Sequence, residues 1–567
     1  MIKGTREVDG RIELAEDLSA SPLFNHDLAP TTIARRTWNL WHIAALWVGM
    51  AVCIPTYMLA AGLMRAGLSW WQAVLTVTLG NFIVLIPMAL NAHAGAKYGI
   101  PFPVFLRAPF GTAGANIPAL LRAAVACGWF GIQTWIGGKA LYMLAAVLLP
   151  SLKESSVIGF LGINGWQFAF FLLFWAINLF FVLRGTESIK WLETWTAPIL
   201  IAVGLGLIVW GATQGGGLGR ILRHSSNFSR PTVTATREGS TVVVGVRPVE
   251  IDGRSRPLRW RIAGGEWGAD RIVTESREVT VEFEPPIKPM KVSVADPGSS
   301  TFWTLFFPML TAMVGYWATL SLNIPDFTRF AKSQRDQVVG QFLGLPATMG
   351  FYSFVGVAAT CAALVLFSDI LVVEQAPWDP VDLLGRFTNP VLVVGAMLFL
   401  AIATLTTNIA ANVVSPANDF SNLAPKLVSF KTGGIITALI GVLIMPWKLV
   451  ERPDTYIFTW LIGYGALLGP IAGILIADYY VVRRTRLELP ELYRVGGKFA
   501  GVNWATIAIL LLAIAPNLPG FLATVGAAEV ATFWKTLFTY AWFVGFGVAF
   551  ILYSLWKPTR TSSTANG

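Results

Sequence analysis

The stretch LWVGMAVCIPTY, residues 46–57, lies inside an apolar run, 40–64, that Gly49 and Pro55 interrupt. The run is long enough to cross the roughly 30 Å of hydrocarbon in a bilayer. Proline removes a backbone donor and glycine permits local unwinding, so these residues predict a broken helix. Broken helices inside a membrane occur where the backbone lines a cavity or packs against protein.

A second stretch, MVGYWATLSLNIPD at residues 313–326, repeats this arrangement, with Gly315 near the middle of its run and Pro325 farther along. The two runs are the first and the sixth along the chain. Interruptions at corresponding places predict two inverted five-helix repeats with a binding site between them. Ordinary kinks are the alternative, which the matched pair makes weaker.

The composition of the whole chain agrees with a membrane protein. Of its 567 residues, 54% are hydrophobic and 13% are charged, whereas soluble domains carry about 25% charged residues. This excludes a disordered chain, a coiled coil and a soluble enzyme, and it predicts an all-α polytopic membrane protein of about twelve helices. The apolar runs lie at 40–64, 69–90, 113–149, 166–184, 191–213, 301–325, 338–368, 386–414, 432–449, 456–480, 501–517 and 532–556.

Charge in the loops predicts the orientation and the domains. Lys and Arg gather in alternate loops, such as those at 35–36, 329–335 and 483–498, which the positive-inside rule places in the cytoplasm together with both termini. We therefore expect a multi-pass protein of the cell (inner) membrane. Its parts are a cytoplasmic tail (1–36), helices 1–5 (37–218), a β-rich insertion (219–298), helices 6–10 (299–485), and helices 11–12 with a cytoplasmic tail (486–567).

The insertion at 219–298 has no spanning run. Short segments rich in β-branched residues, separated by Gly or Pro, predict a small antiparallel sandwich on the outer face. A passive spacer is the simpler interpretation, and an unidentified partner is the alternative. The predicted strands are 241–246, 258–262, 279–284 and 291–294.

Two spans carry polar groups that lipid would not tolerate without a reason. In the third span, Trp129 and Gln133 are four residues apart and share a helical face, which suits a planar ring with an amide edge. In the eighth span, Thr406 and Thr407 precede Asn408 and Asn412. The hydroxyls of these threonines, together with backbone carbonyls that an unwound helix leaves unpaired, are suitable ligands for a hard cation such as Na⁺. Packing of the aromatic ring and interhelical hydrogen bonds, worth about 0.6 kcal/mol each, are the alternatives.

Other kinds of chemistry have little support. The cysteines Cys53, Cys127 and Cys361 form no CxxC pair, and the four histidines are scattered, so a disulfide framework or a zinc site is not expected. No Gly-rich phosphate loop or Ser-His-Asp arrangement stands out, which argues against an enzyme and against a nucleotide-driven pump. The net charge of +10 lies in the loops and does not indicate nucleic acid.

Longer motifs carry a resemblance that covers most of the chain outside the insertion. The sequence resembles the first nucleobase–cation symporter family, which includes sodium–hydantoin, allantoin and uracil transporters. The motifs are ALWVGM (45–50), WFGIQTW (129–135), NIPDFTR (323–329), TNIAAN (407–412), LGPIAG (468–473), DYY (478–480) and GVNW (501–504).

This resemblance implies a five-plus-five inverted-repeat transporter that works by alternating access. By the same resemblance, Trp129 and Trp317 would clamp a planar ligand, Gln133 and Asn412 would contact its amide edges, and Tyr316 would offer a backbone contact. Cys53 stands where the hydantoin member has a glutamine that contacts the ligand. The implied sodium ligands are the carbonyls of Gly49, Val52 and Ala403 and the hydroxyls of Thr406 and Thr407.

Together these features predict a secondary transporter that imports a small planar amide heterocycle with Na⁺, or with H⁺ as in other members. The heterocycle would be allantoin, uracil, hydantoin or a related nucleobase, with a lean toward the allantoin and uracil branch. Two alternatives stay open: a membrane sensor whose insertion binds a ligand, and an amino-acid transporter of the same fold.

Overall fold

The structure is a computed structural model of the 567-residue chain. It describes residues 4–557 with the following exceptions: 66–67, 155, 185, 224–231, 248–249, 252–253, 256–258, 269–270, 274–277, 284–289, 295–300, 367–389 and 450–459. The predicted strand ends at Leu258 and Glu284 therefore lie outside the described residues.

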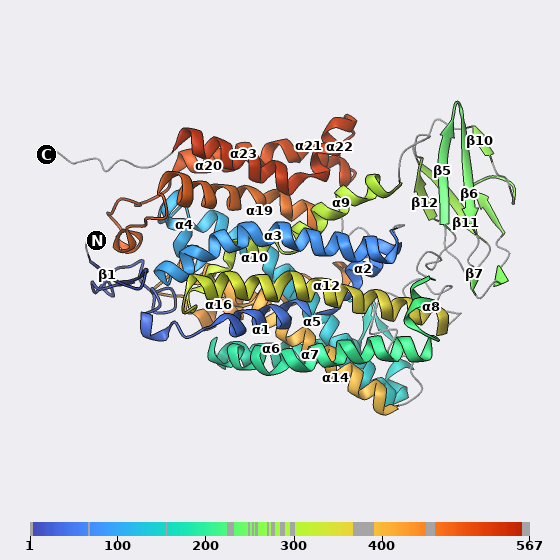
Figure 1. The fold of residues 1–567 in the computed structure, drawn as a ribbon, viewed down its shortest axis with the longest axis horizontal. Coiled ribbons are helices and arrows are strands. Elements are labelled where there is room, and N and C mark those ends of the chain that lie inside the picture. Colours follow the sequence, from blue (N-terminus) through green and yellow to red (C-terminus); the bar gives the residue numbers. More distant parts are fainter. Residues whose placement is uncertain are drawn as a thin grey trace.

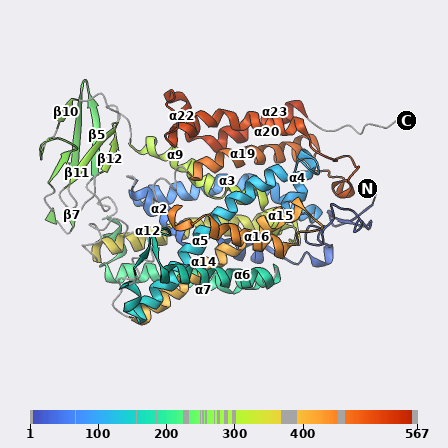
Figure 2. The ribbon, with the colours of Figure 1, turned by 180° about the vertical axis from the view of Figure 1, so that it is seen from behind.

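The chain forms an elongated bundle of helices, with the β-rich insertion at one end and the β1 hairpin with the last turn of α23 at the other (Figures 1 and 2). In its described part, 8 helices are long and apolar enough to cross a membrane, or up to 10 if each bent pair is one span. Two shorter apolar helices, Leu305–Tyr316 and Phe430–Leu443, lie in two further predicted runs. The predicted mostly helical, polytopic fold is confirmed, whereas the inverted repeat stays a prediction.

The helices up to the insertion are α1 (Leu40–Ala51), α2 (Ile54–Arg65), α3 (Trp70–Tyr98), α4 (Phe102–Phe110), α5 (Asn116–Leu148), α6 (Gly165–Arg184), α7 (Thr186–Gln214) and α8 (Leu218–Arg223). Those after it are α9 (Thr301–Tyr316), α10 (Ala318–Asn323), α11 (Pro325–Thr328), α12 (Gln334–Leu366), α14 (Pro390–Asn412), α15 (Val414–Leu423), α16 (Phe430–Leu443), α17 (Pro446–Leu449), α19 (Leu461–Ile476), α20 (Trp504–Ile514), α21 (Leu518–Thr524), α22 (Thr532–Thr539) and α23 (Ala541–Trp556).

Both predicted helix breaks are present. The first span divides into α1 and α2, which are bent by 60° at Val52 and Cys53, between Gly49 and Pro55. The sixth span divides at Trp317, whose φ of −105° and ψ of 14° end α9 before α10 begins. The eighth span is also divided, between α14 and α15 at Val413, a break that the sequence analysis did not anticipate.

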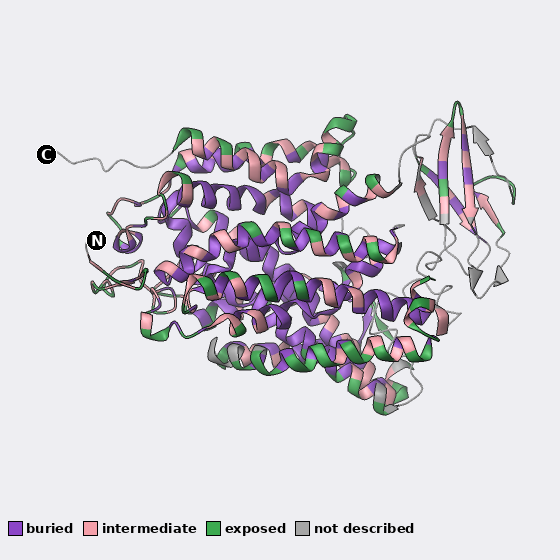
Figure 3. Cartoon of the chain, in the orientation of Figure 1, coloured by how far each residue is buried: buried purple, intermediate pink, exposed green. Residues whose placement is uncertain are grey.

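Burial separates central helices from peripheral ones (Figure 3). Protein buries 83% of the most apolar window in Leu461–Val482 but only 22% of that in Gly165–Arg184. A helix with an exposed apolar surface needs lipid around it. We therefore assign α6 and α7 to the rim and α19 to the core of the bundle.

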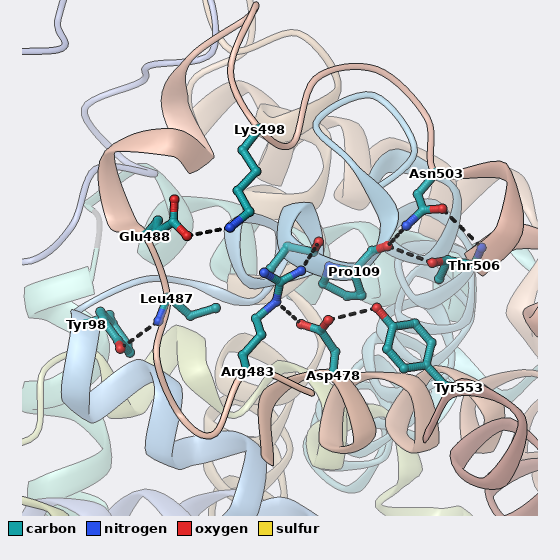
Figure 4. Close-up of polar contacts among 11 residues, drawn as sticks. Tyr98, Pro109, Asp478, Arg483, Leu487, Glu488, Lys498, Asn503, Thr506 and Tyr553 are labelled. Atoms are coloured by element: carbon teal, nitrogen blue, oxygen red, sulfur yellow. Dashed lines mark hydrogen bonds and ion pairs between the residues drawn. The ribbon is translucent and has the colours of Figure 1, made fainter. Parts of the chain in front are cut away.

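The last spans are attached to the core by buried polar contacts at the end of α19 (Figure 4). The segment η5 (Ala477–Val482) continues α19 and carries Asp478, which accepts hydrogen bonds from Arg483 Nε at 2.6 Å and Tyr553 Oη at 2.8 Å. Asn503 Nδ2 and Thr506 Oγ1 donate to the carbonyl of Pro109 at 3.0 and 2.8 Å. These contacts connect α23 to the end of α19 and α20 to α4, and they explain the physical role of the DYY and GVNW motifs.

The N-terminal segment folds onto the same end of the bundle. Strands β1 (Thr5–Val8) and β2 (Arg11–Leu14) form an antiparallel hairpin, and Trp38 N donates to the carbonyl of Phe330 at 2.8 Å. The Arg36 guanidinium is buried and donates to the carbonyl of Ile12 at 2.7 Å. Burial lowers the pKa of Arg36 to about 10, so it keeps its charge at neutral pH.

The insertion contains two three-stranded antiparallel sheets, as the predicted sandwich requires. One has the order β10 (Arg271–Val273), β6 (Thr241–Arg247), β5 (Thr232–Glu238), and the other β12 (Met290–Ser293), β11 (Glu278–Phe283), β9 (Trp260–Ile262). The buried residues Val242, Val244, Val281 and Phe283 belong to one apolar cluster of its own. The insertion is thus a small unit with a separate core. Short ladders β3–β4 (Val157–Ile158, Ile163–Asn164) and β7–β8 (Glu250–Ile251, Arg254–Ser255) complete the strands of the described residues.

Candidate functional site

An aromatic cluster surrounds the break in the sixth span. The Trp129 ring lies 5.7 Å from that of Tyr316 at 89°, and the Tyr316 ring lies 5.0 Å from that of Trp317. Trp47, from α1, packs edge-on against Trp317 at 5.3 Å. All four rings are buried. Trp129 and Trp317 are therefore joined through Tyr316 in the protein interior, at the junction of three helices, rather than facing lipid.

Gln133 lies one turn beyond Trp129 on α5 and is 2% exposed. Its Oε1 atom is fully buried and has no hydrogen-bond partner within the described part of the chain. A buried amide oxygen without a partner loses its hydration and gains nothing in return. Since Gln133 follows Trp129 on the same face, its free acceptor points to a ligand with a hydrogen-bond donor.

The hydroxyl of Tyr316 belongs to a small polar group that the sequence analysis missed. It lies 3.2 Å from Thr56 Oγ1 and 3.4 Å from Cys53 Sγ, and the latter two atoms are 3.3 Å apart. Cys53 is fully buried at the break in the first span. The thiol of Cys53 thus connects the two broken spans. In the sequence, the only indication of this polar group was that Thr56 lies about one helical turn after Cys53.

Oxygen atoms of α1 and α14 converge beside this break. Thr406 Oγ1 lies 3.1 Å from the Gly49 carbonyl oxygen and 2.9 Å from that of Ala403. Thr407 Oγ1 lies 3.0 Å from both of these carbonyls and 3.1 Å from that of Met50. Gly49 and Met50 belong to the last turn of α1, where a helix leaves backbone carbonyls without partners of its own. The donor set is all oxygen, which is what a hard cation requires.

Val52, the fifth predicted cation ligand, lies at the break itself. Its N–H donates to Val48 as the C-cap of α1, with a φ of −81° and a ψ of 83°. Among the other four predicted groups, each hydroxyl contacts both carbonyls, and Val52 lies three residues after Gly49. The contact to Met50 was not predicted.

The two asparagines of the eighth span have different environments. Asn408 Nδ2 donates to Thr134 Oγ1 at 3.0 Å and Asn178 Oδ1 at 3.2 Å, so this side chain binds α14 to α5 and α6. Asn412 Nδ2 donates to Asn408 Oδ1 at 3.1 Å. The interhelical alternative therefore describes Asn408, and Asn412 is held in place by it.

A buried charged pair lies farther along α5. Arg122 Nη1 is 3.9 Å from Asp419 Oδ2 on α15, and both side chains are fully buried. Arg122 Nη2 also donates to the carbonyl of Ala411 at 3.2 Å. Arg122 thus contacts the residue that precedes Asn412. The pair was not identified from the sequence because Arg122 and Asp419 are almost 300 positions apart.

Comparisons with known proteins agree with these features. The model of the family of permeases for cytosine/purines, uracil, thiamine and allantoin matches residues 30–246 and 287–545. The chain is 37% identical over 537 residues to the purine-uracil permease of Arabidopsis thaliana, covering 94% of this chain and 77% of the relative. It is 36% identical over 536 residues to the allantoin permease of Bacillus subtilis, covering 94% and 92%.

Solved structures show the same fold. A nucleobase-cation-symport-1 family transporter in a closed conformation with bromovinylhydantoin bound superposes with a TM-score of 0.67 at 23% identity, covering 94% of this chain and 96% of the other. An inward-facing structure of the same transporter gives a TM-score of 0.64 at 25% identity, covering 94% of each chain. The family match spans most of the chain and leaves out 247–286, inside the insertion. The chain belongs to the family of membrane permeases for cytosine/purines, uracil, thiamine and allantoin, as its broken helices, buried aromatic cluster and oxygen-lined contact lead one to expect.

Proposed function

We propose that this permease imports a small planar amide heterocycle of the allantoin, uracil or hydantoin kind together with a cation. The observation that carries this proposal is the unpartnered Oε1 of Gln133 next to the Trp129–Tyr316–Trp317 cluster. Aromatic faces bind flat rings, and a buried acceptor selects a ring that carries an N–H group. The names of the allantoin, purine-uracil and hydantoin relatives support this class of substrate.

In this proposal the ring lies between Trp129 and Trp317, with Gln133 and Asn412 contacting its edges. Tyr316 offers its backbone, and Cys53 lies behind the hydroxyl of Tyr316 rather than against the ligand. Cys53 Sγ is 3.4 Å from that hydroxyl, which supports an indirect role for the thiol.

Na⁺ is the proposed coupling ion. Gly49, Val52, Ala403, Thr406 and Thr407 would supply its oxygen ligands, and the hydroxyl–carbonyl distances of 2.9 to 3.1 Å support this assignment. An ion bound here would hold α14 against the broken span that also carries Cys53 and Trp47. Coupling follows if ion and substrate both favour the outward-open state. H⁺ is the alternative ion.

We also propose the orientation. The β1 hairpin and the end of α23 would face the cytoplasm and the insertion would lie outside the cell membrane. The two ends of the bundle in Figure 1 are consistent with opposite faces, and the Lys- and Arg-rich loops supply the direction.

The test is uptake by proteoliposomes that contain the purified protein. Allantoin, uracil, hydantoin and an amino-acid mixture would be offered with an inward Na⁺ gradient, an inward H⁺ gradient or neither. Gradient-driven accumulation of at least one heterocycle is expected. Accumulation of amino acids alone would replace the proposal with the amino-acid alternative.

A further inference from the structure

The side-chain amide of Asn408 has its orientation fixed by acceptors on two neighbouring helices. Its Nδ2 atom lies 3.3 Å from the Phe130 carbonyl oxygen, 3.0 Å from Thr134 Oγ1 and 3.2 Å from Asn178 Oδ1. A backbone carbonyl can only accept a hydrogen bond, so the atom of Asn408 that faces Phe130 must be the amino nitrogen. The Oδ1 atom of Asn408 therefore forms the other end of the amide.

The two side chains beside Asn408 Nδ2 are themselves fixed as acceptors. Thr134 Oγ1 donates its hydrogen to the Phe130 carbonyl at 2.7 Å, and Asn178 Nδ2 donates to the Phe174 carbonyl at 2.8 Å. All three side chains are fully buried. A reversed Asn408 amide would set its oxygen against three acceptors, which is repulsive in an interior without water. The packing of α5, α6 and α14 thus determines this orientation.

Asn408 passes its orientation to Asn412, one turn farther along α14. Asn412 Nδ2 donates to Asn408 Oδ1 at 3.1 Å. Among the residues that the structure describes, no hydrogen bond involves Asn412 Oδ1. The Asn412 side chain is only 6% exposed, so this oxygen has lost most of its hydration. A ligand that donates a hydrogen bond to it would compensate for that loss.

Contacts with α5 place Asn412 beside the proposed substrate site. Asn408 Nδ2 contacts α5 at the carbonyl of the residue that follows Trp129. About two turns earlier on α5, Arg122 Nη2 donates to the carbonyl of Ala411 at 3.2 Å. Since Asn412 directly follows Ala411, it lies along the stretch of α5 from 122 to 130, which carries Trp129.

We propose that Asn408 is a positioning residue that presents Asn412 Oδ1 to the substrate, so that the permease requires a ring N–H at this edge. This inference rests on the proposed function, which places Asn412 at an edge of the heterocycle, and it specifies the chemistry of that edge. Lactam and imide rings with a free N–H satisfy it. A ring with a bare nitrogen at the same position sets an acceptor against an acceptor and is rejected.

A purely structural role for Asn408 would have a different consequence. The loss of its hydrogen bonds would lower stability and weaken the binding of all ligands to the same extent. With a positioning role, Asn412 can turn its amide once Asn408 is gone, and it can then offer its amino group to a ring acceptor. The ratio of affinities for two rings that differ in one N–H therefore separates the two roles.

The experiment measures dissociation constants of the purified full-length protein in detergent, in Na⁺ buffer. The probes are uracil, pyrimidin-2(1H)-one and pyrimidin-4(3H)-one. Each pyrimidinone has a bare nitrogen where uracil has one of its two N–H groups. Each also lacks one carbonyl of uracil, but this difference is common to all variants and cancels when their ratios are compared. If uracil is not bound, hydantoin is compared with oxazolidine-2,4-dione, in which a ring oxygen replaces one N–H.

The variants replace one asparagine at a time with leucine, which keeps the volume of the side chain. Asn408→Leu and Asn412→Leu are the test variants, and Asn517→Leu is the matched control. Asn517 is also a buried asparagine that bonds another helix, because its Nδ2 donates to the Ala541 carbonyl at 3.1 Å. It belongs to the last spans and has no contact with Asn412.

We expect the wild type to bind one of the two analogues at least about a hundredfold more weakly than the parent ring. This ratio should fall at least about tenfold in Asn408→Leu and in Asn412→Leu, and Asn517→Leu should keep it. An unchanged ratio in Asn408→Leu, or the same fall in the control, would overturn the positioning role.

The wild type and Asn412→Leu decide the matter if Asn408→Leu does not fold. Equal affinity of the wild type for the parent ring and its analogues, or an unchanged ratio in Asn412→Leu, would overturn the requirement for an N–H at Asn412. Binding of none of these rings or of allantoin by the wild type, with or without Na⁺, would instead mean that the proposed function itself has failed.

Discussion

The side-chain oxygen of Thr407 lies 3.0 Å from the carbonyl oxygen of Gly49. The two residues are far apart in sequence, and their contact joins α14 to the last turn of α1, immediately before the first span breaks. Because the partner is a carbonyl that the helix leaves free, the contact marks the place where a cation could join these two helices.

Replacing this hydroxyl tests the cation site. Thr407→Val keeps the shape of the side chain and removes one proposed ligand, so the Na⁺ concentration for half-maximal uptake should rise at least about tenfold. Thr404→Val is the matched control, because Thr404 donates to Leu400 of its own helix at 2.7 Å. The site would be wrong if both variants showed the same Na⁺ dependence as the wild type.

The substrate site is tested on α5. Trp129→Ala and Gln133→Ala should each abolish saturable uptake while the protein remains in the membrane, because one removes a ring face and the other an edge contact. Uptake and membrane content would be measured on the same cells. Trp135→Ala is the control on the same helix, since Trp135 packs against Trp447 at 5.7 Å in a different cluster. Unchanged uptake in both test variants would remove the proposed site.

Asn408 and Asn412 should separate stability from binding. Asn408→Ala removes the donor to Asn178 Oδ1 and the acceptor of Asn412 Nδ2, so it should lower the free energy of unfolding by about 1–3 kcal/mol. Asn412→Ala should leave the melting temperature closer to that of the wild type and weaken substrate binding. Thermal unfolding in detergent, without and with substrate, measures both effects. A larger loss of stability for Asn412→Ala would reverse these assignments.

The buried pair of Arg122 and Asp419 predicts a pattern of rescue. Removing one partner leaves an uncompensated buried charge, which costs about 3–5 kcal/mol. Arg122→Leu and Asp419→Leu should therefore each be poorly stable, and the double variant should recover part of the loss. The melting temperatures of the three purified proteins decide this. If the double variant were less stable than either single variant, Arg122 and Asp419 would not compensate each other's buried charge.

Deleting the insertion distinguishes a transporter from a sensor. The insertion has its own apolar core, and the family match leaves out 247–286. A chain that lacks 222–297 should therefore keep its uptake and its substrate affinity. Loss of uptake in a deletion variant that still reaches the membrane would show that the insertion takes part in transport.

Much of the fold could be read from the sequence because lipid imposes strict rules. Every spanning backbone must satisfy its own hydrogen bonds, so long apolar runs become helices. Gly49, Pro55 and Gly315 lie close to the observed breaks because these residues perturb the helical backbone directly. The break at Val413 also has a proline three residues after it, Pro416, and the sequence analysis overlooked this signal.

The site was less accessible to sequence reasoning. Trp129 and Gln133 could be paired because they share a face of one helix. The packing of Trp460 against Gly128, the residue before Trp129, could not be foreseen, because Trp460 belongs to another span. Likewise, neither Arg122 nor Asp419 carries a local signal of its partner.

The sequence by itself determined that this chain is a bundle of membrane helices with breaks in its first and sixth spans, because burial in lipid and backbone chemistry act locally along the chain. Only the tertiary structure decided which polar groups meet. The contacts between Thr407 and Gly49, Cys53 and Tyr316, and Arg122 and Asp419 depend on how separate helices pack. Helix packing in lipid is set by the close fit of side chains over the whole bundle, and no short segment encodes that fit.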